Sequence, residues 1–252
     1  MDVLVVEPGR VDAAGGEIVA GWLRAEPAAT FLAAVGTSPL GVYNALAELT
    51  AAGAAGEVDV RELRLVQLDE YVGVADDDRR CLFGWLLRDV ARRLGVDGAQ
   101  VLRLAGDAVD PAAEAARHDA AIVAAGGLGV SVLGIGPNGH LGFNEPPSAP
   151  DAPTRVVDLA EASVTSNAHY WGSTEAVPRR AITVGMDRLL AARRTLVVVK
   201  GAGKREILRQ VVAGPITDDV PASHLRRASG VVLLADDAAW PSDIPVPVAI
   251  EP

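Results

Sequence analysis

The residues best suited to chemistry lie at positions 131–146, in the string SVLGIGPNGHLGFNEP. The apolar run at residues 130–135 predicts a buried strand, and four glycines then predict a tight loop: Gly134, Gly136, Gly139 and Gly142. The loop carries His140 and Glu145, with Asn138 beside them. Because ligands bind at the carboxyl ends of strands in open α/β sheets, this imidazole and carboxylate predict an acid–base site. The alternative is a polar turn in which both side chains cap backbone groups.

Two adjacent acids, Asp69 and Glu70, follow a predicted strand at residues 63–68. Successive side chains of a strand point to opposite faces, so at most one of these carboxylates would face a given pocket. Taken alone, acids at a strand end can also be solvated turn residues. The acidic run at residues 76–78 is interpreted as a solvated loop.

The loop before the second predicted helix could bind an anion. A predicted strand at residues 30–35 runs into Gly36, Thr37 and Ser38, and a helix is expected over residues 40–52. The two hydroxyls and the first-turn N–H groups of the helix would face an anion with the positive end of the helix dipole. Simple N-capping explains the same residues equally well.

Lys204 is the strongest candidate in the sequence for a cation that binds phosphate. It follows an apolar strand at residues 195–199 and a glycine pair, and it begins a helix that runs to residue 213. A lysine at a helix start is poorly placed for the dipole, and a bound anion would remove that conflict. The alternative is an exposed lysine on a first helical turn.

These loops require a scaffold that brings the ends of several strands together. Further strands are expected at residues 3–6, 102–104, 154–157, 181–184 and 230–235, and further helices at 11–24, 82–94, 110–125, 162–171 and 186–192. The alternation predicts one α/β domain over residues 1–252. Its core would be a doubly wound, mostly parallel, Rossmann-like sheet flanked by helices. His118 is expected on the surface of its helix.

Composition narrows the class of function. Half of the 252 residues are hydrophobic but only 4% are aromatic, so we expect an aliphatic core. The net charge of −10 argues against nucleic acid and anionic membranes, and an anionic substrate would need a locally positive pocket. The single cysteine, Cys81, suits a reducing cytoplasm. With no basic region after Met1 and no apolar run of about 18 residues, we expect neither a signal peptide nor a membrane span.

Five strings in order carry a resemblance: GTSP, LDEYVG, GIGPNGHLGFNEP, VPRRAITVG and KGAGK. Together they resemble the glucosamine-6-phosphate deaminases, also called glucosamine-6-phosphate isomerases. The related 6-phosphogluconolactonases share the opening of the glycine-rich string but do not continue with FNEP. The resemblance implies conversion of a small molecule, glucosamine 6-phosphate, to fructose 6-phosphate and ammonia, with no cofactor and no metal.

The resemblance also implies roles for individual residues. Asp69 would move the sugar proton from C2 to C1, and His140 would assist ring opening while Glu145 orients and charges it. Asn138 stands where some members have aspartate. The residues expected to bind the substrate and its phosphate are Gly36, Thr37, Ser38, Glu70, Gly139, His169 and Lys204.

Two departures from the family pattern affect substrate and regulation. His169, in NAHYW, stands where the family has an arginine that clamps the phosphate. Either Lys204 and the GTSP loop hold the phosphate without it, or the substrate is another amino sugar, with Tyr170 and Trp171 in a reshaped pocket. Val157 stands where regulated members have lysine, so we expect no activation by N-acetylglucosamine 6-phosphate.

Other classes of function and the assembly state remain as alternatives. The same fold serves as a non-catalytic sugar-phosphate sensor in transcription regulators. Those proteins carry an N-terminal helix-turn-helix, whereas this sequence begins with a strand, and a sensor is expected to have lost its base. Members of the family occur as monomers and as hexamers, so a homo-oligomer is compatible with the sequence.

Overall fold

The central sheet aligns its strand ends along a single edge. The computed structural model describes residues 1–51 and 58–246; residue 52, the expected end of the second helix, lies outside them. Seven strands pair in the order β1-β10-β9-β6-β2-β3-β5, and every pairing is parallel. The strands are β1 (Asp2–Val6), β2 (Thr30–Ala33), β3 (Arg64–Gln67), β5 (Val101–Leu102), β6 (Val130–Gly134), β9 (Arg194–Val199) and β10 (Val231–Asp236). The predicted doubly wound, parallel α/β class is confirmed.

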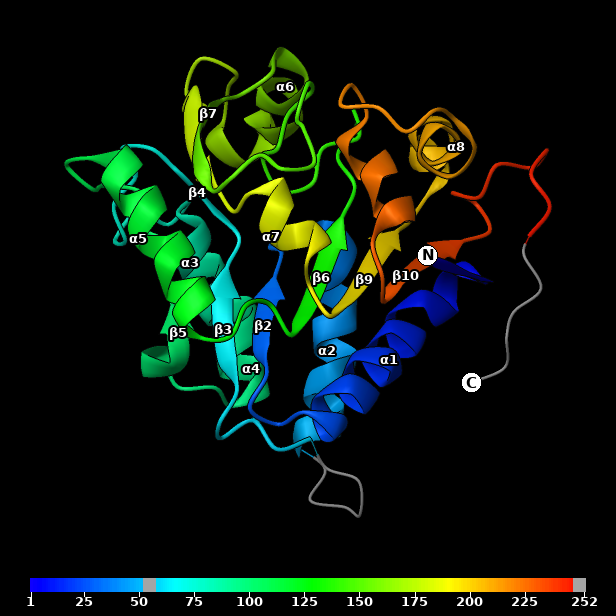
Figure 1. Cartoon of the computed structure of the whole chain (residues 1–252), viewed down its shortest axis with the longest axis horizontal. Coiled ribbons are helices and arrows are strands. Elements are labelled where there is room, and N and C mark those ends of the chain that lie inside the picture. The colour runs from blue at the N-terminus through cyan, green and yellow to red at the C-terminus, as the bar shows by residue number, and fades with distance from the viewer. Residues whose placement is uncertain (52–57, 247–252) are drawn as a thin grey trace.

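Helices cover both faces of this sheet (Figure 1). They are α1 (Val11–Ala25), α2 (Thr37–Ala51), α3 (Leu82–Trp85), α4 (Arg92–Leu94), α5 (Pro111–Ala124), α6 (Glu161–Trp171), α7 (Met186–Leu190) and α8 (Arg205–Ala213). The expected single helix over residues 82–94 contains a π-helical turn, Leu86–Ala91, between α3 and α4. Among the described residues, no helix is both long and apolar enough to cross a membrane.

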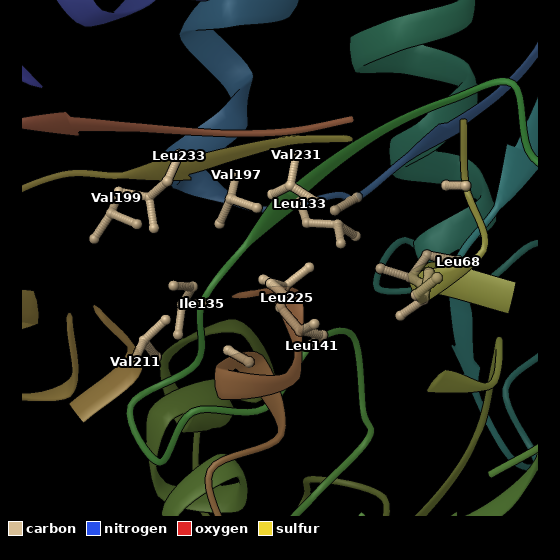
Figure 2. Close-up of a cluster of buried hydrophobic side chains, with 14 of the residues drawn as sticks. Leu68, Leu133, Ile135, Leu141, Val197, Val199, Val211, Leu225, Val231 and Leu233 are labelled. Atoms are coloured by element: carbon tan, nitrogen blue, oxygen red, sulfur yellow. The ribbon is translucent and has the colours of Figure 1, made fainter. Parts of the chain in front are cut away.

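The strands are buried on both faces, as parallel strands between helices must be. Along β6, Val132 belongs to one hydrophobic cluster and Leu133 to the other. In β9 the neighbours Leu196 and Val197 divide in the same way. Figure 2 shows the cluster that contains Leu133 and Val197. This aliphatic core holds the carboxyl ends of β6 and β9 in a fixed relation.

A second, smaller sheet corrects the expectation that all strands join one sheet. It is antiparallel, in the order β4-β8-β7, with β4 at Asp69–Tyr71, β8 at Arg180–Thr183 and β7 at Arg155–Asp158. The predicted strands at residues 154–157 and 181–184 therefore lie outside the main sheet. Together with α6, this sheet sits beyond the carboxyl ends of the central strands (Figure 1). It forms a cap over the edge where ligands bind in such folds.

The expectation that His118 lies on a helix surface is wrong. Its side chain is 0% exposed, and its Nε2 donates to the backbone oxygen of Gln67 at 2.9 Å. The helix α5 packs against β5 in the main sheet and against β7 and β8 in the small sheet, so this face is covered. Burial lowers the pKa of His118 and favours the neutral ring.

Candidate active site

A cavity of about 470 Å³ lies at the carboxyl edge of the central sheet. Its walls come from the loops after β2 and β6, the junction of β3 with β4, the segment before α3, and α6. The residues of the sequence prediction that line it are Gly36, Thr37, Ser38, Asp69, His140, His169 and Lys204. The structure thus brings together five separate regions of the sequence at one site.

Asp69 is the acid that faces the cavity. It begins β4 and pairs with Thr183 of β8, so extended geometry persists beyond the end of β3. The residue is only 7% exposed. Burial, and secondarily the charge of Glu70, raise the pKa of Asp69 to about 8. A carboxyl group with such a pKa can act as a base near neutral pH.

Glu70 lies outside the cavity lining, contrary to the expectation that it contacts substrate. It is 1% exposed and accepts hydrogen bonds from the backbone N–H groups of Leu82 and Phe83, at 3.0 and 2.9 Å, in the first turn of α3. The backbone of Tyr71 and the amide of Gln67 also donate to it, each at 3.0 Å. Burial raises the pKa of Glu70, and these bonds act against that rise. Its role here is to anchor α3, because strand alternation turns it away from Asp69.

His140 lines the cavity and is backed by a carboxylate. Its Nδ1 lies 3.2 Å from Oε2 of Glu145, and the side-chain amide of Asn138 donates to the same oxygen at 2.8 Å. Burial raises the pKa of Glu145, but the hydrogen bond and charge of His140, with bonds from Ser163 and Asn138, lower it by more. Glu145 is therefore ionised, so Nδ1 carries the proton and Nε2 is left as the basic atom. Glu145 and Asn138 act from behind His140, outside the lining.

Two glycines of the loop are required by its geometry. A Cβ on Gly136 would lie 2.0 Å from Nε2 of His140, so only glycine admits the ring at this place. Gly139 has a φ of +86°, and a Cβ there would lie 2.8 Å from Cγ1 of Val220. Gly139 does not line the cavity, so its contribution is to the shape of the loop and not to the expected substrate contact.

Two groups in the cavity suit an anion. Helix α2 begins at Thr37, three residues earlier than expected. Its first turn, which includes Thr37 and Ser38, lines the cavity. Lys204 ends a 3₁₀ turn before α8, lines the cavity, and donates from Nζ to the backbone oxygen of Ile135 at 2.7 Å. A helix N-terminus and an ammonium group on one cavity form a suitable cradle for a phosphate.

Sequence and structure comparisons place this site in a known family. The family model described as glucosamine-6-phosphate isomerases/6-phosphogluconolactonase matches residues 17–234. The chain belongs to this glucosamine-6-phosphate isomerase/6-phosphogluconolactonase family. Two relatives named glucosamine-6-phosphate deaminase come from Cutibacterium acnes and Streptomyces coelicolor. The first is 40% identical over 82% of this chain and 78% of the relative, and the second 36% identical over 95% and 91%.

Solved structures of the family agree with the fold. A monomeric glucosamine-6-phosphate deaminase superposes with a TM-score of 0.90 at 30% identity, covering 95% of this chain and 98% of that one. The 6-phosphogluconolactonase from Thermotoga maritima gives a TM-score of 0.71 at 18% identity, over 93% and 98%. The second likeness concerns the fold alone. The predicted resemblance to the deaminase branch is confirmed.

One wall of this family member's cavity is aromatic, and the sequence indicated only two of its residues, Tyr170 and Trp171. Five aromatic side chains line it, in a chain that has only 4 Trp, 3 Tyr and 3 Phe: Tyr71, Trp85, Phe143, Tyr170 and Trp171. Ring centroids lie 5.2 Å apart for Tyr71 and Trp171, and 5.1 Å apart for Trp85 and Tyr170. We call these five residues the aromatic wall. The sequence signal for this wall is that aromatic residues are rare in the chain, yet Tyr170 and Trp171 stand next to each other at the end of α6.

Two arginines of the same lining were also missed. Arg79 and Arg80 directly follow the acidic run at residues 76–78. The guanidinium of Arg80 lies 4.3 Å from the ring centroid of Trp171 and 2.6 Å from Oδ2 of Asp78. Within residues 1–51 and 58–246, no group of three or more His, Cys, Asp or Glu side chains could hold a metal ion.

Proposed function

We propose that this protein is a glucosamine-6-phosphate deaminase, which converts glucosamine 6-phosphate and water to fructose 6-phosphate and ammonia. The observation that carries the proposal is a single cavity that holds both Asp69, with a pKa of about 8, and His140 supported by Glu145. The reaction needs one group that shuttles a proton between oxygens and another that moves a proton between carbons. The names of the relatives support the same substrate.

Ring opening is assigned to His140. Its Nε2 would take the proton from O1 of the hemiacetal and return a proton to the ring oxygen, giving the open-chain aldehyde. The imidazolium that forms in between is stabilised by ionised Glu145 at Nδ1, 3.2 Å away. Asn138 holds the same carboxylate oxygen and so restricts the rotation of Glu145.

Proton transfer between carbons is assigned to Asp69. The aldehyde acidifies C2, so the carboxylate can remove the C2 proton while O1 takes up a proton, which gives an enolamine. Asp69 then returns the C2 proton to C1 as the nitrogen gives up one proton, which replaces the proton that O1 gained. The product is a 2-imino sugar phosphate. Water then adds at C2, and the C–N bond breaks to release ammonia and the ketose. The base is used twice and returns to its starting state.

Binding of the phosphate is assigned to the start of α2 and to Lys204. Both lie on the cavity that holds Asp69 and His140, so the phosphate can anchor the sugar while its reacting carbons face the acid–base groups. Remote binding energy of this kind positions the reacting atoms without taking part in the chemistry.

A related amino sugar is the second candidate substrate, and the aromatic wall is the observation that favours it. The wall adds apolar surface next to His169, whose Nδ1 donates to the backbone oxygen of Ser166 at 2.8 Å. Such surface could contact a substituent on the sugar. The chemistry assigned to Asp69 and His140 would remain the same.

The test measures ammonia release from glucosamine 6-phosphate and from glucosamine, with the wild type, Asp69→Asn and His169→Arg. We expect activity on the phosphorylated sugar, and its loss in Asp69→Asn. Because Asp69 must be ionised, kcat/KM should fall about tenfold for each pH unit below its pKa of about 8. Activity that appears only in His169→Arg would instead show retained chemistry with a different natural substrate.

A further inference from the structure

The cavity carries more positive than negative side chains in an acidic protein. Its lining contains a single carboxylate, Asp69, against Lys204, Arg79 and Arg80, while the chain as a whole has a net charge of −10. The local excess of positive charge fits the expectation of an anionic substrate. A cation without a protein partner would be the best placed to bind such a substrate.

Two of the three cations have protein partners. Arg80 is held by Asp78, through its backbone N–H at 2.8 Å and its guanidinium at 2.6 Å, and it stacks on Trp171. Lys204 already donates to the backbone oxygen of Ile135. For Arg79, the part of the chain that the structure describes offers neither an ion pair nor a hydrogen bond, and its side chain is exposed. Its guanidinium is therefore available to a ligand.

His169 is a poor donor to an anion. A carbonyl oxygen can only accept, so the bond from Nδ1 to Ser166 places the proton of the neutral ring on Nδ1. The other nitrogen, Nε2, then presents a lone pair and would repel a phosphate oxygen. The ring also packs on Tyr170, with centroids 3.6 Å apart. The imidazole at this position therefore supplies neither a charge nor an aligned donor to the phosphate, so any donor from α6 is a neutral side chain such as Asn167.

Arg79 belongs to a segment that is fixed against α6. Glu70 anchors the segment from one side, through the backbone of Leu82 and Phe83. On the other side, Arg80 stacks on Trp171, and Trp85 contacts Tyr170. Arg79 directly precedes Arg80, the first residue of these contacts, and it lines the same cavity as His169. A guanidinium from this segment can thus reach the end of the cavity that α6 covers.

We propose that Arg79 binds the phosphate of the substrate and determines the preference for a phosphorylated sugar. The proposal rests on the proposed function for the identity of the substrate. An arginine offers a permanent charge and a planar set of donors that matches phosphate oxygens. Arg79 supplies from the segment before α3 the donor that His169 does not supply from α6. Lys204 and the first turn of α2 complete the site.

The experiment compares Arg79→Gln and Arg79→Lys with Arg92→Gln, which changes an exposed arginine of α4 outside the cavity lining. Steady-state kinetics use glucosamine 6-phosphate, and calorimetry measures binding of fructose 6-phosphate and inorganic phosphate. Arg79→Gln should raise KM and both dissociation constants about tenfold or more while kcat stays close to the wild type. For Arg79→Lys, KM and both dissociation constants should lie between those of the wild type and Arg79→Gln. For Arg92→Gln, all three should match the wild type.

A double variant gives the most specific readout. Adding His169→Arg to Arg79→Gln places a guanidinium on the facing helix and should restore most of the lost affinity. The proposal is overturned when Arg79→Gln and Arg92→Gln give the same KM and the same phosphate affinity. A wild type that binds fructose 6-phosphate but releases no ammonia refutes the proposed function instead, and the calorimetric comparison then still decides the role of Arg79.

Discussion

The floor and the aromatic wall of the cavity are built in different ways. The floor consists of Asp69 and the loop after β6, where glycines and side-chain hydrogen bonds hold His140 against Glu145. The wall joins residues that are about a hundred positions apart in the chain, through ring contacts such as Tyr71 with Trp171. Chemistry is thus placed by local backbone geometry, and the shape of the cavity by long-range packing. Changes in the floor should affect kcat, and changes in the wall should affect KM.

The largest effect should come from the two neighbouring acids at the start of β4. Asp69→Asn removes the proposed base and should lower kcat about 100- to 10,000-fold with little change in KM. Glu70→Gln should leave kcat close to the wild type but lower the free energy of unfolding by about 1–2 kcal/mol. The reason is that Glu70 accepts the N–H groups that begin α3. Steady-state kinetics and thermal denaturation of both variants test this separation of a catalytic acid from a structural one. Equal kcat losses would contradict the separation of roles.

Sequence reasoning predicted the floor because its signals lie within short strings. His140 and Glu145 are five residues apart in the glycine-rich string, and their side chains are in direct contact in the structure. Alternation along a strand correctly separated Asp69 from Glu70, although it could not tell which one faced the cavity. The parallel sheet followed from apolar runs that alternate with helical segments.

The wall and the cap could not be predicted in the same way. Strand β8 pairs with β4 at one edge and β7 at the other, and no local pattern encodes those partners. His118 appeared to be a surface residue because the sequence of α5 does not reveal that two sheets cover it. Arg79 follows a charged run that is typical of loops. Its segment is brought to the cavity by the bonds of Glu70 to the start of α3 and by the ring contacts of Arg80 and Trp85 with α6.

The support behind His140 should show the next largest effect. Glu145→Gln removes the negative charge that faces Nδ1 at 3.2 Å, so the imidazolium formed during ring opening loses its stabilisation. We expect kcat to fall about 10- to 100-fold while KM is kept. Glu145→Asp, which keeps the charge, should recover part of the loss. A variant with unchanged kcat would show that His140 acts without this carboxylate.

The wall should give a smaller effect, on binding alone. Trp85→Ala removes a ring that lines the cavity and packs edge-on against Tyr170, with ring centroids 5.1 Å apart. KM should rise about threefold to tenfold, with kcat unchanged. Phe83→Ala is the matched control, because Phe83 lies on the same helix but not in the lining. A fall in kcat for Trp85→Ala, or equal KM changes in both variants, would remove the distinction between wall and floor.

The last prediction concerns stability, and it tests whether burial in the floor makes the Asp69 carboxylate costly to ionise. The pKa of Asp69 rises from 3.8 to about 8 on folding, so the folded protein holds a proton that the unfolded chain releases. That contribution to stability is complete below pH 3.8 and is lost as pH rises toward about 8. Asp69→Asn cannot ionise, so its melting temperature should exceed that of the wild type by an amount that grows across this window. Each kcal/mol corresponds to about 2–4 °C in a chain of this size. Trp85→Ala should show no such dependence on pH, because the wall carries no buried charge. A difference in melting temperature between Asp69→Asn and the wild type that stays constant with pH would contradict this prediction. Asp69 would then ionise as an ordinary carboxylate, and its charge in the floor would not destabilise the folded protein.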